Sequence, residues 1–334
     1  MTVSVQTSTT GSAPVLLLTS GDGPWAWHRA RYRLLDGALD PTQTTYPLSS
    51  IRKLRTLGTA MRTKDGDQVT FAFQDASRAA PAMPLQLDLG ATFEEAGVGS
   101  QVWDASIALS LVRRSGLVPL PTAARVLELG CGLGLPSIDL ARDAAAAART
   151  VLLTDARSKL LSLAEANAQA VRRRQPFATE VHVAKLDWTD EADLSGATGG
   201  NLCDGDVRTP DAGATTAAAA CHADVVLGSD ISYTPESVGP LAALLERLAA
   251  PLTLIIGPAG RPSMRALYER LAASAVVAVE ERKLTLVSAN ADDADTRRAA
   301  AAAPAAAEED AEDDTATMRS CGVHSLLIVR PRAA

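Results

Sequence analysis

The stretch RVLELGCGLGLPSIDL, residues 125–140, decides the fold of this chain. Its first five residues are an apolar run that predicts a buried strand, and the glycines after it predict a turn into a helix. Glu128 is followed by Gly130, Gly132 and Gly134 in the spacing E-x-G-x-G-x-G. Glycine lets the backbone adopt positive φ and approach a ligand without an intervening Cβ. The stretch therefore predicts a loop that holds a small ligand, and the alternative is a tight turn with no ligand.

The spacing of the glycines argues against a dinucleotide. A dinucleotide-binding fingerprint reads G-x-G-x-x-G and would place its third glycine at position 135, where this chain has leucine. A phosphate-binding loop would also require a lysine, which residues 125–140 lack. We therefore expect a ligand without phosphate, and an oxidoreductase that binds NAD is a distant alternative.

The chain around this stretch alternates between predicted strands and predicted helices. Near-continuous apolar strands alternating with helices indicate a mostly parallel sheet with helices on both faces, which is a doubly wound α/β fold. Such sheets bind ligands at the carboxyl ends of their strands. The predicted strands are 125–129, 151–155, 181–188, 224–230, 252–256, 276–286 and 324–330, and the predicted helices are 135–148, 158–174, 241–248 and 262–273.

Two further kinds of segment complete the predicted organisation. Residues 1–97 form an N-terminal extension, partly disordered, with strands at 69–74 and 85–89 and a turn-rich lead-in at 62–67. Low-complexity insertions near 195–220 and 289–317 contain too few apolar side chains to offset the entropy of ordering. The acidic cluster at 308–314 is either a solvated loop or a site for a basic partner.

Composition limits the compartment and the partners. The 334 residues are 47% hydrophobic with a net charge of −7, which suits a globular protein and argues against non-specific nucleic-acid binding. No window stays apolar for the ~20 residues that span a bilayer, so we expect no membrane partner. The cysteines lie too far apart for a disulfide framework or a zinc ribbon, so we expect a cytoplasmic or nuclear protein without a metal. We also expect a monomer, although no residue pattern indicates the oligomeric state. They are Cys131, Cys203, Cys221 and Cys321.

Acidic residues end the successive predicted strands. Asp155 can accept hydrogen bonds from both hydroxyls of a ribose, or it can cap the following helix. Asp187 and Trp188 can bind an adenine by its amino group and its face, or the tryptophan can be plain core. Asp230 ends the strand at 224–230. Together with Glu128, these carboxylates indicate a ligand that contains an adenosine.

Five motifs carry a resemblance to a known family. They are QVWDASIALS (101–110), ELGCGLGLP (128–136), TD (154–155), LDW (186–188) and GSDISY (228–233). The set resembles the seven-stranded S-adenosylmethionine-dependent methyltransferases, and more narrowly methyltransferase family 16, the methyltransferase-like 21 group of protein-lysine methyltransferases. The resemblance covers residues 98–258 and the closing strand. It implies a Rossmann-like class I methyltransferase domain at 98–334, with seven strands in the order 3-2-1-4-5-7-6 and the last antiparallel.

The resemblance also implies S-adenosylmethionine as cofactor and assigns residues to it. Trp103 would pack against the cofactor, Asp155 would hold the ribose, and Ser229 would close the pocket near the sulfonium. Asp187 and Trp188 would flank the adenine. The remaining cofactor residues belong to the loop, and they are Glu128, Gly130, Cys131, Gly132 and Gly134.

Asp230 and Tyr233 form the D-x-x-Y pair that lines the substrate-lysine channel in this family. The expected reaction is methyl transfer to a lysine side chain of a protein, in which alignment alone is worth roughly 7–11 kcal/mol. Asp230 would attract the incoming ammonium and Tyr233 would align the amine. Alternatively, Asp230 bonds amides of the turn and Tyr233 packs under the next helix. The alternative functions are a small-molecule N-methyltransferase and a catalytically inactive interaction protein.

Overall fold

A computed structural model describes residues 3–6, 15–18, 28–75, 83–90, 93–146, 148–190, 193, 223–290 and 317–332. The insertion predicted near 195–220 and the acidic cluster at 308–314 lie outside these residues. Of the insertion predicted at 289–317, the described residues 289 and 290 end one strand and residue 317 begins the next.

The core of the fold is a sheet in the order β10-β9-β8-β11-β12-β14-β13. Neighbouring strands from β10 to β12 are parallel, whereas β14 is antiparallel to both β12 and β13. Numbered along the catalytic unit this is the order 3-2-1-4-5-7-6, so the predicted fold class is confirmed. The strands are β8 (Arg125–Leu129), β9 (Thr150–Asp155), β10 (Glu180–Lys185), β11 (Val225–Ser229), β12 (Leu252–Pro258), β13 (Val277–Asn290) and β14 (Thr317–Pro331).

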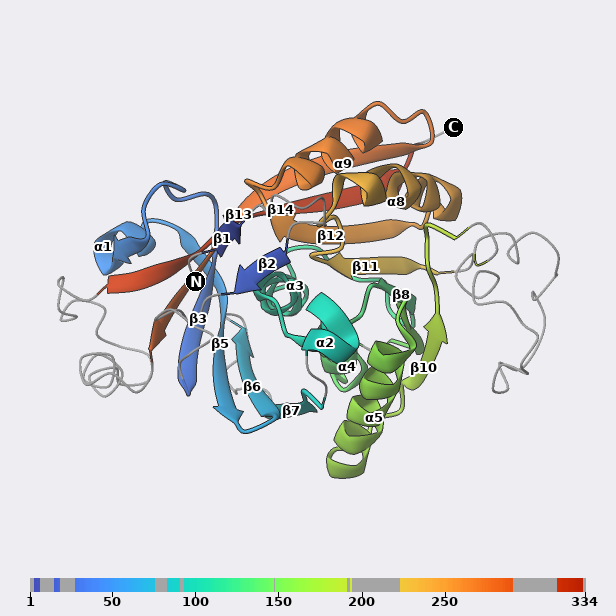
Figure 1. The fold of residues 1–334 in the computed structure, drawn as a ribbon, viewed down its shortest axis with the longest axis horizontal. Coiled ribbons are helices and arrows are strands. Elements are labelled where there is room, and N and C mark those ends of the chain that lie inside the picture. Colours follow the sequence, from blue (N-terminus) through green and yellow to red (C-terminus); the bar gives the residue numbers. More distant parts are fainter. Residues whose placement is uncertain are drawn as a thin grey trace.

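Helices cover both faces of this sheet because successive side chains of a strand point to opposite faces (Figure 1). Val126 of β8 belongs to the core shared with one set of helices, and Leu127 belongs to the core on the other side. The first face carries α3 (Asp104–Arg114), α4 (Leu135–Ala141) and α5 (Ser158–Arg174), and the second carries α8 (Pro235–Leu248) and α9 (Pro262–Ala272). Short helical turns at α2 (Phe93–Ala96) and η1 (Gly97–Ser100) precede α3.

One predicted helix is wrong in its length. The helix expected over 135–148 ends at Ala141, and α4 therefore spans only the first half of that range. The chain turns there because Asp143 Oδ1 accepts a hydrogen bond from the backbone N–H of Ala145 at 3.1 Å, which closes a local turn that competes with the helix. The helix expected over 158–174 has the predicted bounds.

The N-terminal strands continue the same sheet beyond β13, which brings the sheet to 12 strands. They add β3 (Arg29–Asp36), β5 (Arg55–Asp65), β6 (Gln68–Asp75) and β7 (Leu85–Asp88) in that order, while β4 (Thr45–Pro47), followed by α1 (Leu48–Ile51), pairs with β14. A separate pair is formed by β1 (Val3–Gln6) and β2 (Val15–Leu18). The turn-rich lead-in expected at 62–67 is wrong for residues 62–65, which end β5 between its partners β3 and β6.

Helix α3 is enclosed between the N-terminal strands and the main sheet (Figure 1). All its residues from Ile107 to Arg114 are buried, so Arg113 and Arg114 carry their charges into the interior. Asp139 of α4 forms ion pairs with both guanidinium groups and with Arg142, and Asp143 forms a further pair with Arg113. Buried charges require such partners because an unpaired charge in the interior costs several kcal/mol.

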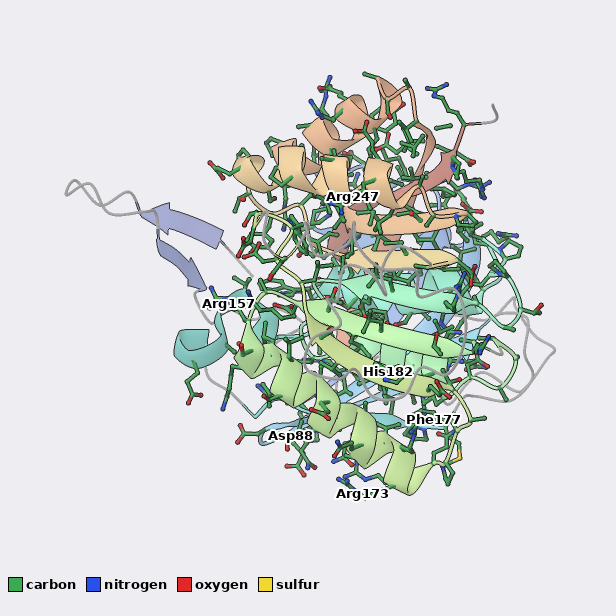
Figure 2. The ribbon with its side chains drawn as sticks, turned by 90° about the vertical axis from the view of Figure 1, so that its right-hand side faces the viewer. Asp88, Arg157, Arg173, Phe177, His182 and Arg247 are labelled. Carbon is green, nitrogen blue, oxygen red and sulfur yellow. The ribbon has the colours of Figure 1, made fainter. Side chains whose placement is uncertain are left out.

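At the edge of the sheet formed by β10, helix α5 packs against β9 and β10. Figure 2 shows this helix from Arg157 at its start to Arg173 near its end, with His182 of β10 beside it in the view. Among the described residues, none of the helices has both the length and the apolar character needed to cross a bilayer.

Candidate active site

The glycine loop lies where β8 ends and α4 begins. All three glycines have positive φ, namely +61° at Gly130, +52° at Gly132 and +82° at Gly134. A Cβ on Gly130 would lie 2.7 Å from Ile231 Cγ2, and one on Gly132 would lie 3.1 Å from the carbonyl oxygen of Gly99. Both the backbone conformation and the close neighbours therefore require glycine, as the sequence predicted.

Asp155 ends β9 beside this loop. Its Oδ2 accepts the backbone N–H of Gly132 at 3.1 Å, and its Oδ1 accepts the backbone N–H of Arg157 at 3.1 Å. Asp155 could instead have capped the following helix. The N-cap position of α5 is held by Arg157, so Asp155 is not that cap. Burial raises the pKa of Asp155, and the hydrogen bonds from Arg157 and Gly132 oppose that rise.

Glu128 lies at the base of the loop as a fully buried carboxyl group. Neither of its oxygens has a hydrogen-bond partner within ordinary geometry. Burial raises its pKa to about 8, and the nearby hydroxyl and backbone N–H of Ser137 at the start of α4 oppose the rise. Buried polar groups are nearly always paired, and Ser137 supplies a hydroxyl and a backbone N–H beside this carboxyl.

Cys131 lies in the same loop but has no reactive environment. Its side chain is buried, and burial raises the pKa of the thiol well above its usual value. A nucleophilic cysteine requires the opposite, a lowered pKa. The interpretation of Cys131 as a packing group therefore agrees with its surroundings.

Trp103 and Ser229 are joined to the loop through the start of α3. The indole N–H of Trp103 donates to the carbonyl oxygen of Val98 at 2.8 Å, and Trp103 is the residue that precedes the first turn of α3. One turn further, Ser106 Oγ lies 2.9 Å from Ser229 Oγ at the end of β11. The start of α3 thus lies over the carboxyl ends of the parallel strands, where a doubly wound sheet binds its ligand.

Asp187 and Trp188 follow β10, and their side chains contact different groups. The ring of Trp188 lies 3.4 Å from the position of a Cβ on Gly130, so it lines the loop. The Oδ1 atom of Asp187 accepts hydrogen bonds from the backbone N–H of Thr189 at 2.9 Å and from its hydroxyl at 2.6 Å. This carboxylate therefore stabilises its own turn with one oxygen.

Asp230 and Tyr233 follow β11 at the same rim. Asp230 has a positive φ of 59°, a conformation that aspartate tolerates better than most residues. Its Oδ1 forms an ion pair with the guanidinium of Arg261. Burial raises the pKa of Asp230, and the charge of Arg261 opposes that rise. The side chain of Tyr233 is 55% exposed, so it lies on the surface and does not pack under the following helix.

Sequence reasoning missed several polar residues that the fold brings to this site. Asp104 begins α3, and its Oδ1 is buried without a hydrogen-bond partner. Burial raises the pKa of Asp104 to about 7, while the charge of Arg62 on β5 opposes the rise and that of Asp230 adds to it. Asp104 belongs to the VWDA motif and was detectable there. Arg62 and Arg261 carry no local signal, because only tertiary structure brings them close.

The site as a whole is rich in carboxylates whose charged form is disfavoured. Burial raises the pKa of each of them, and a bound cation would lower it again. They are Asp104, Glu128, Asp155 and Asp230. The described residues contain no group of three or more His, Cys, Asp or Glu side chains placed to bind a metal ion. Each of these carboxylates would be stabilised in its charged form by a cation bound beside it.

A Rossmann-like sheet with this strand order, this loop and acidic strand ends defines the class I methyltransferases. The lysine methyltransferase family model matches residues 84–201. Protein N-lysine methyltransferase METTL21A of Danio rerio is 30% identical over 187 residues, which cover 55% of this chain and 69% of that protein. The chain therefore belongs to the lysine methyltransferase family, methyltransferase family 16. S-adenosylmethionine is its cofactor, as predicted.

Two solved structures are also similar to this chain. TrmN from Thermus thermophilus matches with a TM-score of 0.39 and 12% identity over 68% of this chain and 49% of that one. A putative O-methyltransferase from Klebsiella pneumoniae matches with a TM-score of 0.37 and 15% identity over 70% of this chain and 82% of that one.

Proposed function

We propose that this chain transfers a methyl group from S-adenosylmethionine to a lysine side chain of a protein. The observation that carries the proposal is the pairing of Asp230 with a cationic side chain at the carboxyl end of β11. A partly buried carboxylate that already holds a guanidinium is suited to receive the ammonium of a lysine. The activity named for METTL21A, its relative in Danio rerio, supports the same substrate class.

The cofactor supplies an electrophilic methyl group on a positively charged sulfur. The glycine loop lets the backbone approach it, and we assign the ribose to Asp155 and the adenine to Trp188 with Asp187. Glu128 contributes an unpartnered acceptor at the base of the loop. We place Trp103 and Ser229 at the methionine end, because the start of α3 and the end of β11 meet there.

The acceptor amine must lose a proton before it can attack. A lysine with a pKa near ~10.4 is mostly protonated at pH 7. In our proposal Asp230 attracts the ammonium, and the exposed ring of Tyr233 aligns it at the rim. Desolvation and the positive charge of a bound S-adenosylmethionine would then favour the neutral amine, which would release its proton to solvent before it accepts the methyl group. A protein acceptor, a monomeric enzyme and a cytoplasmic or nuclear location complete the proposal.

Methyl labelling of a cell lysate tests this function. Lysate proteins are incubated with the chain and S-adenosylmethionine carrying a radioactive methyl group, separated on a gel, and hydrolysed to amino acids. We expect label in protein bands and in methylated lysine. Label confined to the low-mass fraction would show the small-molecule N-methyltransferase instead. No heat on titration with S-adenosylmethionine would show the inactive interaction protein.

Two variants separate the acceptor site from the cofactor site. Asp230→Asn keeps a residue that tolerates positive φ but removes the charge, so labelling should fall at least 100-fold while cofactor affinity changes little. Asp224→Asn is the matched control, because Asp224 forms an exposed ion pair with Arg125 before β11. Equal loss of labelling and of cofactor affinity in Asp230→Asn would contradict the role assigned to Asp230.

A further inference from the structure

Asp230, which receives the acceptor ammonium in the proposed function, already pairs with a side chain of the same protein. The guanidinium of Arg261 pairs with Asp230 Oδ1, although the two residues are separated by 31 positions in the sequence. An arginine remains charged at every physiological pH, so this internal cation does not leave by losing a proton. An incoming lysine therefore meets a carboxylate whose Oδ1 already holds a cation.

Both members of this pair are held in place by neighbouring strands. The backbone N–H of Asp230 donates to the carbonyl oxygen of Ile256 on β12 at 2.8 Å. Arg261 follows β12 and precedes the first turn of α9, and its backbone N–H donates to the carbonyl oxygen of Pro258 at 3.1 Å. The hydroxyl of Ser263 donates to the carbonyl oxygen of Ser232, which fixes α9 against the segment that carries Asp230.

The groups around the guanidinium leave it able to move. The Arg261 side chain is 26% exposed, whereas that of Asp230 is 12% exposed, so the cation lies on the solvent side of the pair. His324 of β14 lies nearby, and burial lowers its pKa to about 4, so it is neutral at pH 7 and neither repels nor replaces the guanidinium. Displacement of Arg261 toward solvent would leave Asp230 without its charge partner until another cation replaces it.

We propose that Arg261 is a specificity residue that occupies the acceptor position on Asp230 and must be displaced by the substrate lysine. This inference rests on the proposed function, in which Asp230 receives the acceptor. A tethered cation competes at a high effective concentration, which for short tethers is in the millimolar range. A free amine contributes one charge and few contacts and competes poorly. A lysine on a protein surface adds interface contacts that offset the loss of the internal pair.

The test compares a small acceptor with protein acceptors in matched variants. N-acetyl-L-lysine methylamide is the small probe, lysate protein is the large one, and methyl transfer is counted from radiolabelled S-adenosylmethionine. The variants are Arg261→Gln, which removes the cation, and Arg261→Lys, which keeps one. Arg265→Gln is the control, because Arg265 lies one turn further along α9 and pairs with Glu269 in solvent. All assays are run at pH 8.5, because burial raises the pKa of Asp230 and the Arg261→Gln variant lacks the charge that opposes that rise.

We expect Arg261→Gln to raise kcat/KM for N-acetyl-L-lysine methylamide at least tenfold, which corresponds to about 1.4 kcal/mol. Arg261→Lys and Arg265→Gln should stay close to the unmodified chain, and Arg261→Gln combined with Asp230→Asn should lose the gain. Unchanged cofactor affinity by calorimetry shows that each variant is folded. An unchanged or lower rate in a folded Arg261→Gln variant overturns the inference.

The outcomes separate this inference from the proposed function. If the unmodified chain labels lysine in lysate proteins and Arg261→Gln gives no gain on the small probe, the specificity role is wrong and the function stands. If every variant binds the cofactor but none labels lysine in either acceptor, the proposed function is wrong and the inference falls with it.

Discussion

The backbone N–H of Gly132 donates a hydrogen bond of 3.1 Å to Asp155 Oδ2, which joins the glycine loop after β8 to the carboxyl end of β9. The loop is held a second time by the N–H of Cys131, which donates to the carbonyl oxygen of Thr154 at 2.8 Å. The residues that shape the backbone around the cofactor and the carboxylate assigned to its ribose are therefore one bonded unit.

Asp155→Ala should weaken S-adenosylmethionine binding by roughly 10- to 100-fold, because it removes charge-assisted hydrogen bonds to the loop and to the ligand. Titration calorimetry with the cofactor and with its demethylated product measures the loss. Asp187→Ala is the comparison, since Oδ1 of Asp187 bonds Thr189 in its own turn. Asp187→Ala should cost less affinity, because one oxygen of Asp187 already bonds its own turn, and an equal loss in the two variants would contradict the larger contribution expected of Asp155.

Gly130→Ala should destabilise the protein by about 2–5 kcal/mol, from strain at positive φ together with overpacking against Ile231. Gly116→Ala is the matched control, because Gly116 has a φ of +67° but nothing within 4 Å of an added Cβ. It should cost only the conformational strain, about 1–2 kcal/mol. Urea unfolding gives both values, and a cost for Gly130→Ala no larger than that of the control would show that the close contact with Ile231 is unimportant.

Glu128 should make the ligand-free protein less stable as the pH rises. Burial raises its folded pKa to about 8, whereas in an unfolded chain the value is ~4.3. The folded state then binds more protons than the unfolded state between these values, so the free energy of unfolding falls as the pH rises through this window. Urea unfolding at pH 5.5, 7 and 8.5 measures the slope, and Glu128→Gln should reduce it. The same slope in both proteins would refute this assignment.

The same group should couple cofactor binding to proton release. A bound sulfonium favours the ionised carboxylates around it, so Glu128 and Asp104 should lose protons on binding near pH 7. Calorimetry in buffers of different ionisation enthalpy counts these protons. The uncharged thioether product should release fewer, and an equal number would argue against a cation as the cause.

Asp139→Asn should destabilise the protein by about 3–5 kcal/mol, because it leaves Arg113, Arg114 and Arg142 buried without their shared carboxylate. Asp224→Asn, which breaks an exposed pair with Arg125, should cost no more than about 1 kcal/mol. The guanidinium groups hold the pKa of Asp139 below its usual range despite its burial. Its contribution is therefore present above ~pH 4 and is lost as the pH falls below that value. Acid unfolding of the two variants measures the difference.

Much of the catalytic core could be predicted from the sequence because its signals are local. The strand at 125–129 and the helix at 158–174 have the predicted bounds, and each depends on an apolar pattern within a few turns of chain. The loop glycines were identified by spacing alone. In contrast, β3 alternates arginines with apolar residues and β5 carries few large apolar side chains, so neither strand was recognised.

The sequence by itself determined the glycine loop and the acidic strand ends, because each follows from residues close together along the chain, whereas the strand order was predicted only through the resemblance to a known family. Only the tertiary structure decided that the N-terminal strands join the same sheet and enclose α3, and that Arg261 occupies Asp230. These features depend on pairs such as Leu284 with Asp36 and Arg261 with Asp230, which backbone pairing and strand crossover bring together. No local sequence pattern predicts such a pair, because its two residues come into contact only once the chain has folded.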